Sequence, residues 1–164
     1  GRDMAMDFKS ASFIKAVEKW ADATESEFVA TCGGSMLMLQ RMVVDGTGSL
    51  SGTPKDTGQA KSNWFIGVNE DVTTQSTDTT KQNMPNAQTI IAQAIANPDN
   101  VKFISLSNNL PYIRHLEYGL YSQNSKTGKT VNGFSTQAPN GMFRISVAQF
   151  ERVFNQQLAA RRKK

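Results

Sequence analysis

The first repeating pattern along the chain predicts a long amphipathic helix. Its stripe positions recur every three or four residues, a spacing that places side chains on one helix face; they are Phe13, Val17, Trp20, Thr24, Phe28, Leu39, Met42 and Val43. Ser10 or Ser12 is suited to cap the start, and Asp45-Gly46 with Gly48 is expected to end the helix. Gly33 and Gly34 interrupt the pattern, each at a cost of about 1 kcal/mol relative to alanine. They indicate either a bend, which we favour, or a neighbouring backbone that packs close.

The middle of the chain predicts two strands and two more helices. Residues 63–69 alternate, with Trp64, Ile66 and Val68 on one face, and residues 101–106 form a second apolar run. Between them, Pro85 is expected to open a helix that Asn97-Pro98 ends; its apolar face holds Ile90, Ile91, Ala94 and Ile95. A short helix follows from Pro111 to Gly119, a residue typical of helix C-termini.

The last third predicts a hairpin and a final helix. Asn132-Gly133 is a strong two-residue hairpin signal, although its flanks alternate poorly. The final helix has one apolar stripe, made of Phe143, Val147, Phe150, Phe154 and Leu158. We therefore expect an α+β fold, a small and mainly antiparallel sheet covered by two long helices, with extended polar loops. We expect residues 1–164 to form a single domain, with residues 1–7 as a cloning remnant or flexible start and residues 159–164 as a basic tail.

Two polar stretches, residues 70–83 and 120–136, contain few side chains suited to a core. Both are longer than the ~12–15 residues usual for an unstructured loop in a compact domain. We expect both to be mobile in the isolated protein and to become ordered against partner molecules.

The net charge of +4 comes from four consecutive residues at the C-terminus: Arg161, Arg162, Lys163 and Lys164. Without them, 14 of the 18 basic residues remain, which balance the 14 acidic ones. The basic run is therefore either a solvated tail or a contact for DNA or an acidic partner. No apolar stretch approaches the ~18 residues of a membrane span. Cys32 is the only cysteine, which excludes an internal disulfide and suits a reducing compartment.

No residue set predicts catalysis, a metal or a cofactor. Residues 125–130 end in Gly-Lys-Thr, but position 123 is Gln123 where a phosphate-binding loop requires glycine. His115 is the only histidine, and one His with one distant Cys cannot form a structural zinc site. We interpret His115 as a surface or interface side chain and expect the protein not to be an enzyme.

Two short motifs have a physical logic of their own. Residues 53–58 read TPKDTG, in which Pro54 favours an extended chain, Asp56 or Thr57 can bond backbone amides, and Gly58 permits a tight turn. This segment is either a plain turn or a turn presented to a neighbouring subunit.

Residues 110–119 read LPYIRHLEYG, and they place Tyr112, Leu116 and Tyr118 beside Arg114 and Glu117. Tyrosine and arginine are enriched at protein interfaces. Tyr112 and Leu116 are therefore either core or interface residues, and the same alternatives stay open for the other three.

These motifs lie within two longer stretches, residues 53–64 (TPKDTGQAKSNW) and 108–119 (NNLPYIRHLEYG). In order along the chain, these two stretches and residues 137–154, which start QAPNGMF, resemble the head–tail joining proteins of tailed bacteriophages, also called neck, tail-completion or minor tail-component proteins. The matching positions are Pro54, Asp56, Thr57 and Gly58; Pro111, Tyr112, Leu116, Glu117, Tyr118 and Gly119; and Ala138, Pro139 and Gly141. The resemblance covers the middle and the end of the chain.

The resemblance implies a structural virion protein at the head–tail interface that assembles in the host cytoplasm. It implies a homo-oligomeric ring, commonly sixfold, between connector and tail proteins, with genomic DNA passing through the lumen. The polar region at residues 70–100 and the basic tail depart from the family pattern, and these departures leave open which ring the chain forms. A small basic nucleic-acid-binding protein is the alternative.

Overall fold

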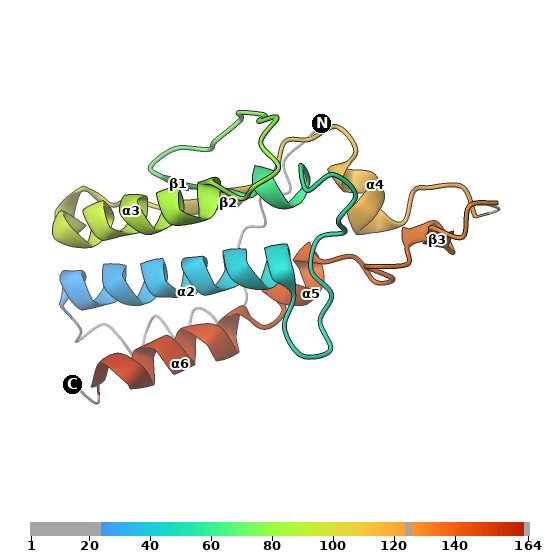
Figure 1. Ribbon diagram of the computed structural model, residues 1–164. Coiled ribbons are helices and arrows are strands. Elements are labelled where there is room, and N and C mark those ends of the chain that lie inside the picture. The colour runs from blue at the N-terminus through green and yellow to red at the C-terminus, as the bar shows by residue number, and fades with distance from the viewer. Residues whose placement is uncertain (1–23, 124–125, 163–164) are drawn as a thin grey trace.

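The computed structural model describes residues 24–123 and 126–162 and confirms an α+β fold (Figure 1). The predicted helix caps at Ser10 and Ser12, the stripe from Phe13 to Trp20, the proposed flexible start and Lys163-Lys164 lie outside these residues. The described elements are α2 (Glu25–Asp45), η1 (Lys61–Asn63), β1 (Phe65–Val68), α3 (Asn83–Ala96), η2 (Pro98–Asn100), β2 (Ile104–Ser107), α4 (Ile113–Tyr118), β3 (Thr130–Val131), β4 (Phe134–Ser135), α5 (Phe143–Val147) and α6 (Phe150–Arg162).

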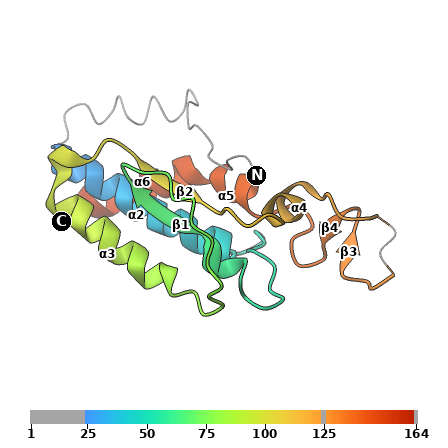
Figure 2. The ribbon, with the colours of Figure 1, turned by 90° about the horizontal axis from the view of Figure 1, so that it is seen from above.

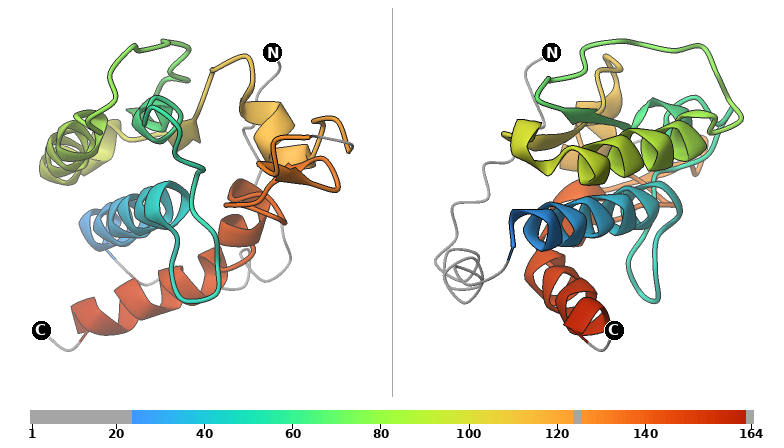
Figure 3. Two further views of the ribbon diagram at one scale, coloured as in Figure 1. Left: turned by 45° about the vertical axis from the view of Figure 1, so that its right-hand side comes forward. Right: turned by 90° about the vertical axis from the view of Figure 1, so that its left-hand side faces the viewer.

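Three long helices are stacked side by side, with α2 between α3 and α6 (Figures 1 and 3). Strands β1 and β2 pair antiparallel, with Ile66 opposite Leu106, and both strands contact α2. Helix α3 packs against β1 as well as against α2, whereas α6 packs against α2. The core between these layers includes Leu39, Trp64 and Phe154, all without exposed surface.

Helix α2 begins later than the apolar stripe predicts. Thr24 has an extended backbone, with ψ at 149°, and its side chain accepts a hydrogen bond from the Glu27 amide at 3.2 Å. Thr24 is therefore an N-cap, and the prediction of one helix running through this position is wrong. The predicted end is confirmed, because Asp45 is the last helical residue and Gly46 follows with φ at 78°.

The two glycines of α2 are sites of close packing within an uninterrupted helix. A Cβ on Gly33 would lie 2.7 Å from Cγ2 of Ile91 on α3, and one on Gly34 would lie 2.6 Å from Oε1 of Gln157 on α6. The absence of side chains at these positions lets both neighbours approach the α2 backbone. The close neighbours are side chains and not the backbone that the alternative to a bend predicted.

The predicted terminal helix is two helices. Helix α5 ends at Val147, and after a turn at residues 148–149 α6 begins at Phe150. The break lets Phe143 stack on Trp64, with ring centroids 5.3 Å apart, while Phe154 meets Phe28 on α2 at 6.5 Å. One straight helix would direct its apolar stripe to a single neighbour, and this chain uses two. The element starts also shift: α3 begins at Asn83, two residues before Pro85, and β2 begins at Ile104.

The first polar stretch is a loop, as predicted, but it is tied to the body of the protein. Asn63 holds it through both ends of its amide, accepting from the Ser76 amide at 2.8 Å and donating to the Ser76 carbonyl at 2.9 Å. Ser105 donates to the Glu70 carbonyl at 2.7 Å. These bonds argue against the expected mobility of residues 70–83 in the isolated protein.

The second polar stretch contains the predicted hairpin. Strands β3 and β4 pair antiparallel, and Asn132 and Gly133 both have positive φ, at 52° and 85°, as a primed hairpin turn requires. We call residues 118–123 and 126–137 the arm. It projects beyond the end of the helix stack at which α4 lies (Figures 1 and 2).

Candidate functional site

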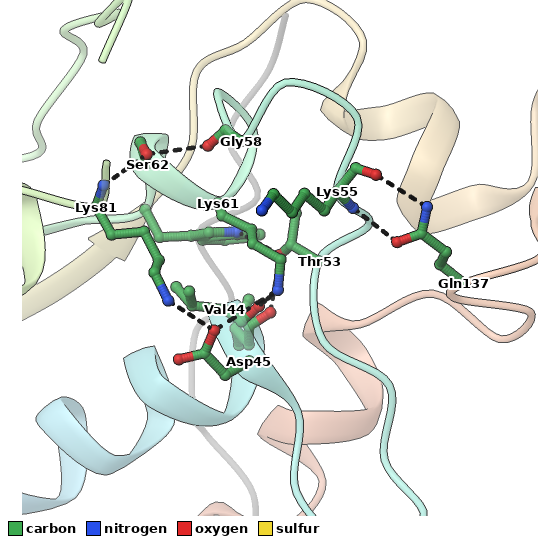
Figure 4. Close-up of polar contacts among 11 residues, drawn as sticks. Val44, Asp45, Thr53, Lys55, Gly58, Lys61, Ser62, Lys81 and Gln137 are labelled. Carbon is green, nitrogen blue, oxygen red and sulfur yellow. Dashed lines mark hydrogen bonds and ion pairs between the residues drawn. The ribbon is translucent and has the colours of Figure 1, made fainter. Parts of the chain in front are cut away.

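The three sequence stretches that carry the resemblance meet at one end of the helix stack. The first is the TPKDTG turn, which is anchored by Thr53. The Thr53 amide and hydroxyl both donate to the Val43 carbonyl at 2.8 Å, and the hydroxyl oxygen accepts from the Trp64 indole at 2.8 Å (Figure 4). One buried threonine thus joins the end of α2, the turn and the start of β1.

A charged group next to the turn supports the same junction. Lys61 donates to the Val44 carbonyl at 2.7 Å, and the Asp45 carboxylate lies between the ammonium groups of Lys61 (3.6 Å) and Lys81 (3.1 Å) (Figure 4). The last carbonyls of α2 thus lie near two cations, which is the favourable sign at a helix C-terminus.

Glu117 joins the second stretch to the third. Its carboxylate has no exposed surface, and Oε2 accepts from the amides of Met142 (2.9 Å) and Phe143 (2.8 Å). Its other oxygen, Oε1, accepts from the amide of Arg144 at 2.9 Å and from the Arg144 Nε at 3.0 Å. These amides open α5 and have no partner within that helix, so Glu117 of α4 caps α5 from a distance of 25 positions in sequence.

Gly119 makes the junction with the arm. It ends α4 in the left-handed conformation, with φ at 64° and ψ at 46°, as predicted. A Cβ at this position would collide with the ring of Phe134, so only glycine lets the hairpin pack against the end of α4. The Tyr121 amide donates to the Gly133 carbonyl at 3.0 Å, which fixes the first residues of the arm to its turn.

The turn and the arm are bridged directly. The Gln137 side chain accepts from the Lys55 amide at 2.9 Å and donates to the Lys55 carbonyl at 3.0 Å (Figure 4). Between turn, α4 and arm lies an open pocket of about 790 Å³. Its lining includes Asp56, Tyr112, Leu116, Tyr121, Lys129 and Gln137.

The pocket holds two tyrosines in an altered environment. Partial burial, with smaller effects of Tyr121 and Asp56, raises the pKa of Tyr112. Burial likewise raises the pKa of Tyr121. Both phenols are therefore neutral at physiological pH, and both residues line the pocket.

The predicted interface residues separate into two groups. Asp56, Thr57, Arg114 and Tyr118 are exposed, and Tyr112 and Gly119 are partly exposed. Pro54, Gly58, Leu116 and Glu117 are buried. Because the Glu117 carboxylate is fully enclosed and bonded within the chain, its side chain does not reach a second subunit, and its assignment as an interface residue is corrected to an internal cap. Leu116 belongs to the core, the first of its two interpretations.

The exposed surface of α4 is a cation–aromatic group. The guanidinium carbon of Arg144 lies 4.4 Å from the centroid of the Tyr118 ring, and that of Arg114 lies 5.9 Å away. His115 is exposed, as interpreted, and its ring lies 5.4 Å from that of Tyr121. Sequence reasoning missed Arg144, Tyr121 and Gln137. Gln137 and Arg144 lie within the third stretch but not at its matching positions, and Tyr121 lies two residues after Gly119.

The predicted basic tail begins inside α6. Arg161 and Arg162 form its last exposed turn, and the Arg161 guanidinium lies against α2, 3.3 Å from where a Gly34 Cβ would be. The structure thus makes this part of the tail the helical end of α6, in the same helix as Phe154, where the third matched stretch ends.

Over residues 24–123 and 126–162, no cluster of three or more His, Cys, Asp or Glu side chains has an arrangement suited to a metal ion. In the same part of the chain, no helix combines the length and the apolar character needed to cross a bilayer. No family model matches the chain, and no curated protein or solved structure matches it significantly.

Proposed function

We propose that this chain is a structural virion protein of the head–tail joint of a tailed bacteriophage, a ring subunit of the neck or tail end. Its partners in this proposal are further copies of itself, commonly six in such rings, together with the connector and tail proteins on either side. Genomic DNA passes through the lumen without sequence-specific contact. The protein acts in the virion, after assembly in the host cytoplasm, and uses no cofactor and no catalytic group.

The observation that carries the proposal is the convergence of the three matched stretches on one junction. Residues that recur in the family pattern have mutually dependent structural tasks here: Glu117 caps the α5 start that follows Ala138-Pro139, and Gly119 admits the arm. The bridge from Lys55 to Gln137 ties the turn to the same junction. If the three segments matched the family pattern by chance, their residues would not be expected to contact one another in the fold. The contacts among them therefore support the resemblance.

A stop codon introduced early in the gene of the encoding phage tests the proposal. Without the protein we expect filled heads and complete tails that remain separate, visible by electron microscopy of the lysate, and restored virions when the chain is supplied from a plasmid. Mass spectrometry of purified wild-type virions should detect the chain in a small, fixed number of copies. Normal infectious particles from the stop-codon phage, or absence of the chain from virions, would refute the proposal.

A DNA-binding assay on the purified protein tests the alternative of a nucleic-acid-binding protein. This alternative rests on the exposed Arg161 and Arg162. Binding to duplex DNA that weakens steeply as salt increases, and that disappears on removal of residues 161–164, would favour it, because phosphate contacts release counterions.

A further inference from the structure

The arm is the only long part of the described chain that bears charge of one sign and exposed apolar surface together. No Asp or Glu occurs between Glu117 and Glu151, whereas Lys126, Lys129 and Arg144 fall in that interval. Both lysines are exposed. Three of the four large apolar side chains exposed in the described residues are also here: Tyr118 at 41%, Leu120 at 54% and Val131 at 54%.

The opposite end of the helix stack has the complementary composition. The fourth exposed apolar side chain, Phe103 at 45%, lies there. Asn69, which directly precedes Glu70, holds the Phe103 backbone: its side-chain oxygen accepts from the Lys102 amide at 2.6 Å, and its backbone amide donates to the Phe103 carbonyl at 2.9 Å. Four exposed carboxylates belong to the same group of segments: Glu70 and Asp71 follow Asn69, Asp99 precedes Asn100, whose carbonyl accepts from the Asn69 side chain, and Glu25 lies beside Asp99. We call these four residues, with Phe103, the acidic end.

Two of these carboxyl groups oppose each other in the free chain. Glu25 and Asp99 are hydrogen-bonded, and this contact raises the pKa of Glu25. A neighbouring cation would relieve the repulsion between them. Lys102 is the cation next to Phe103, while Arg161 and Arg162 end α6, the helix that packs against α2 on the side away from α3 (Figure 3).

We propose that the arm of one copy docks on the acidic end of a second copy, in a head-to-tail contact. The basic side chains of the arm would face the carboxylates of the acidic end, and the exposed apolar side chains of the arm would face Phe103. The two surfaces lie at opposite ends of the molecule (Figures 1 and 2), so one chain cannot satisfy both. A contact between different surfaces of identical subunits closes into a ring when its rotation permits. This inference rests on the proposed function, because it identifies the two surfaces through which subunits of the proposed ring contact each other.

A polyanion such as DNA is the other partner that a basic arm fits. The exposed Leu120 and Val131 argue against it, because apolar groups gain nothing from a phosphate backbone. The experiment includes this partner as an outcome.

Charge exchange tests the contact by sedimentation velocity on the full chain. Lys126→Glu with Lys129→Glu should weaken self-association at least about tenfold, and so should Glu25→Lys with Asp99→Lys. All four changes in one chain should restore it, because the charges complement each other again. The control, Arg41→Glu with Arg152→Glu, makes the same change in net charge at exposed positions of α2 and α6 and should leave self-association unchanged. Leu120→Asp tests the apolar part independently, and a thermal melt verifies the fold of every variant.

Three results would overturn the contact. One is a wild-type chain that stays monomeric up to about 1 mM, where even weak specific contacts associate. Another is unchanged association of the arm double variant and of Leu120→Asp. The third is an arm double variant that loses affinity for duplex DNA while its oligomeric state is retained. None of these depends on whether the chain occurs in virions, so this contact and the proposed function fail separately.

Discussion

Replacing Glu117 by glutamine isolates the contribution of the buried cap. In the wild type, each carboxylate oxygen accepts two hydrogen bonds, Oε2 from Met142 and Phe143 and Oε1 from two donors of Arg144. Glutamine keeps the shape but converts one oxygen into an NH₂ group, which is a donor. In either orientation of the new side-chain amide, its NH₂ group faces two N–H donors, either those of Met142 and Phe143 or the two of Arg144, and these donors lose their acceptor.

The magnitude follows from these lost bonds. A hydrogen bond to a charged group contributes about 1.5–3 kcal/mol, and removing one partner of a buried charged pair costs about 3–5 kcal/mol. The Arg144 side chain is 46% exposed, so its own pairing with Glu117 adds little and the backbone bonds dominate. We expect Glu117→Gln to lower the free energy of unfolding by about 3–5 kcal/mol, a large part of the ~5–15 kcal/mol of a typical domain.

Urea titration followed by far-UV circular dichroism measures this loss, and a thermal melt should show a Tm lower by about 6–20 °C. Glu151→Gln is the control: this carboxylate is exposed in the first turn of α6, and its replacement should change the free energy by less than about 0.5 kcal/mol. A Glu117→Gln variant within about 1 kcal/mol of the wild type would refute the assignment of Glu117 as the cap that joins α4 to α5.

Three further predictions concern α2 and its surroundings. Gly33→Ala should lower stability by about 1–3 kcal/mol, because the new Cβ meets the stiff, buried Ile91. Gly34→Ala should be neutral or stabilising by up to about 1 kcal/mol, because its Cβ faces the flexible side chain of Gln157. Equal effects of the two substitutions in thermal melts would contradict this packing. Thr53→Val should cost about 1–3 kcal/mol in urea titrations, since the buried indole N–H loses its acceptor, and a neutral result would show that this bond is dispensable. Burial raises the pKa of Cys32 to about 12, so its thiol should react with iodoacetamide at pH 8 at least about a hundredfold more slowly in the native protein than in urea. The free energy of unfolding should also fall as the pH rises from about 9, because the thiol of the unfolded chain ionises first. Equal reaction rates in the native protein and in urea would exclude a buried thiol.

Local signals in the sequence predicted the elements that depend on local chemistry. Gly119 ends α4 and Asn132-Gly133 forms the hairpin turn because both need positive φ, which the residue type reveals. The apolar stripe in residues 143–158 predicted helical structure correctly but not its division, because which neighbour each phenylalanine meets is a property of the tertiary fold. The first apolar stripe, in residues 13–43, hid the start of α2, since Thr24 fits both a helix face and an N-cap.

The candidate site was predictable in its segments and not in its contacts. The motif identified Glu117, but a carboxylate beside Arg114 and Tyr118 fits an interface as well as a cap, and its partners lie 25 to 27 positions away. The ties between residues 70–83 and the body are of the same long-range kind. A polar composition alone does not distinguish a tied loop from a mobile one.

The closed base of the arm has a consequence for engineering. The contact of Gly119 with Phe134 and the bond from Tyr121 to Gly133 bring the two ends of the arm together, and Glu117 closes the core behind them. Added length beyond such a closure costs only about 0.6 kcal/mol for each doubling of the loop. Residues 126–129 are thus a position where a peptide tag or a fluorophore can be inserted with the rest of the fold intact, which would make each subunit traceable.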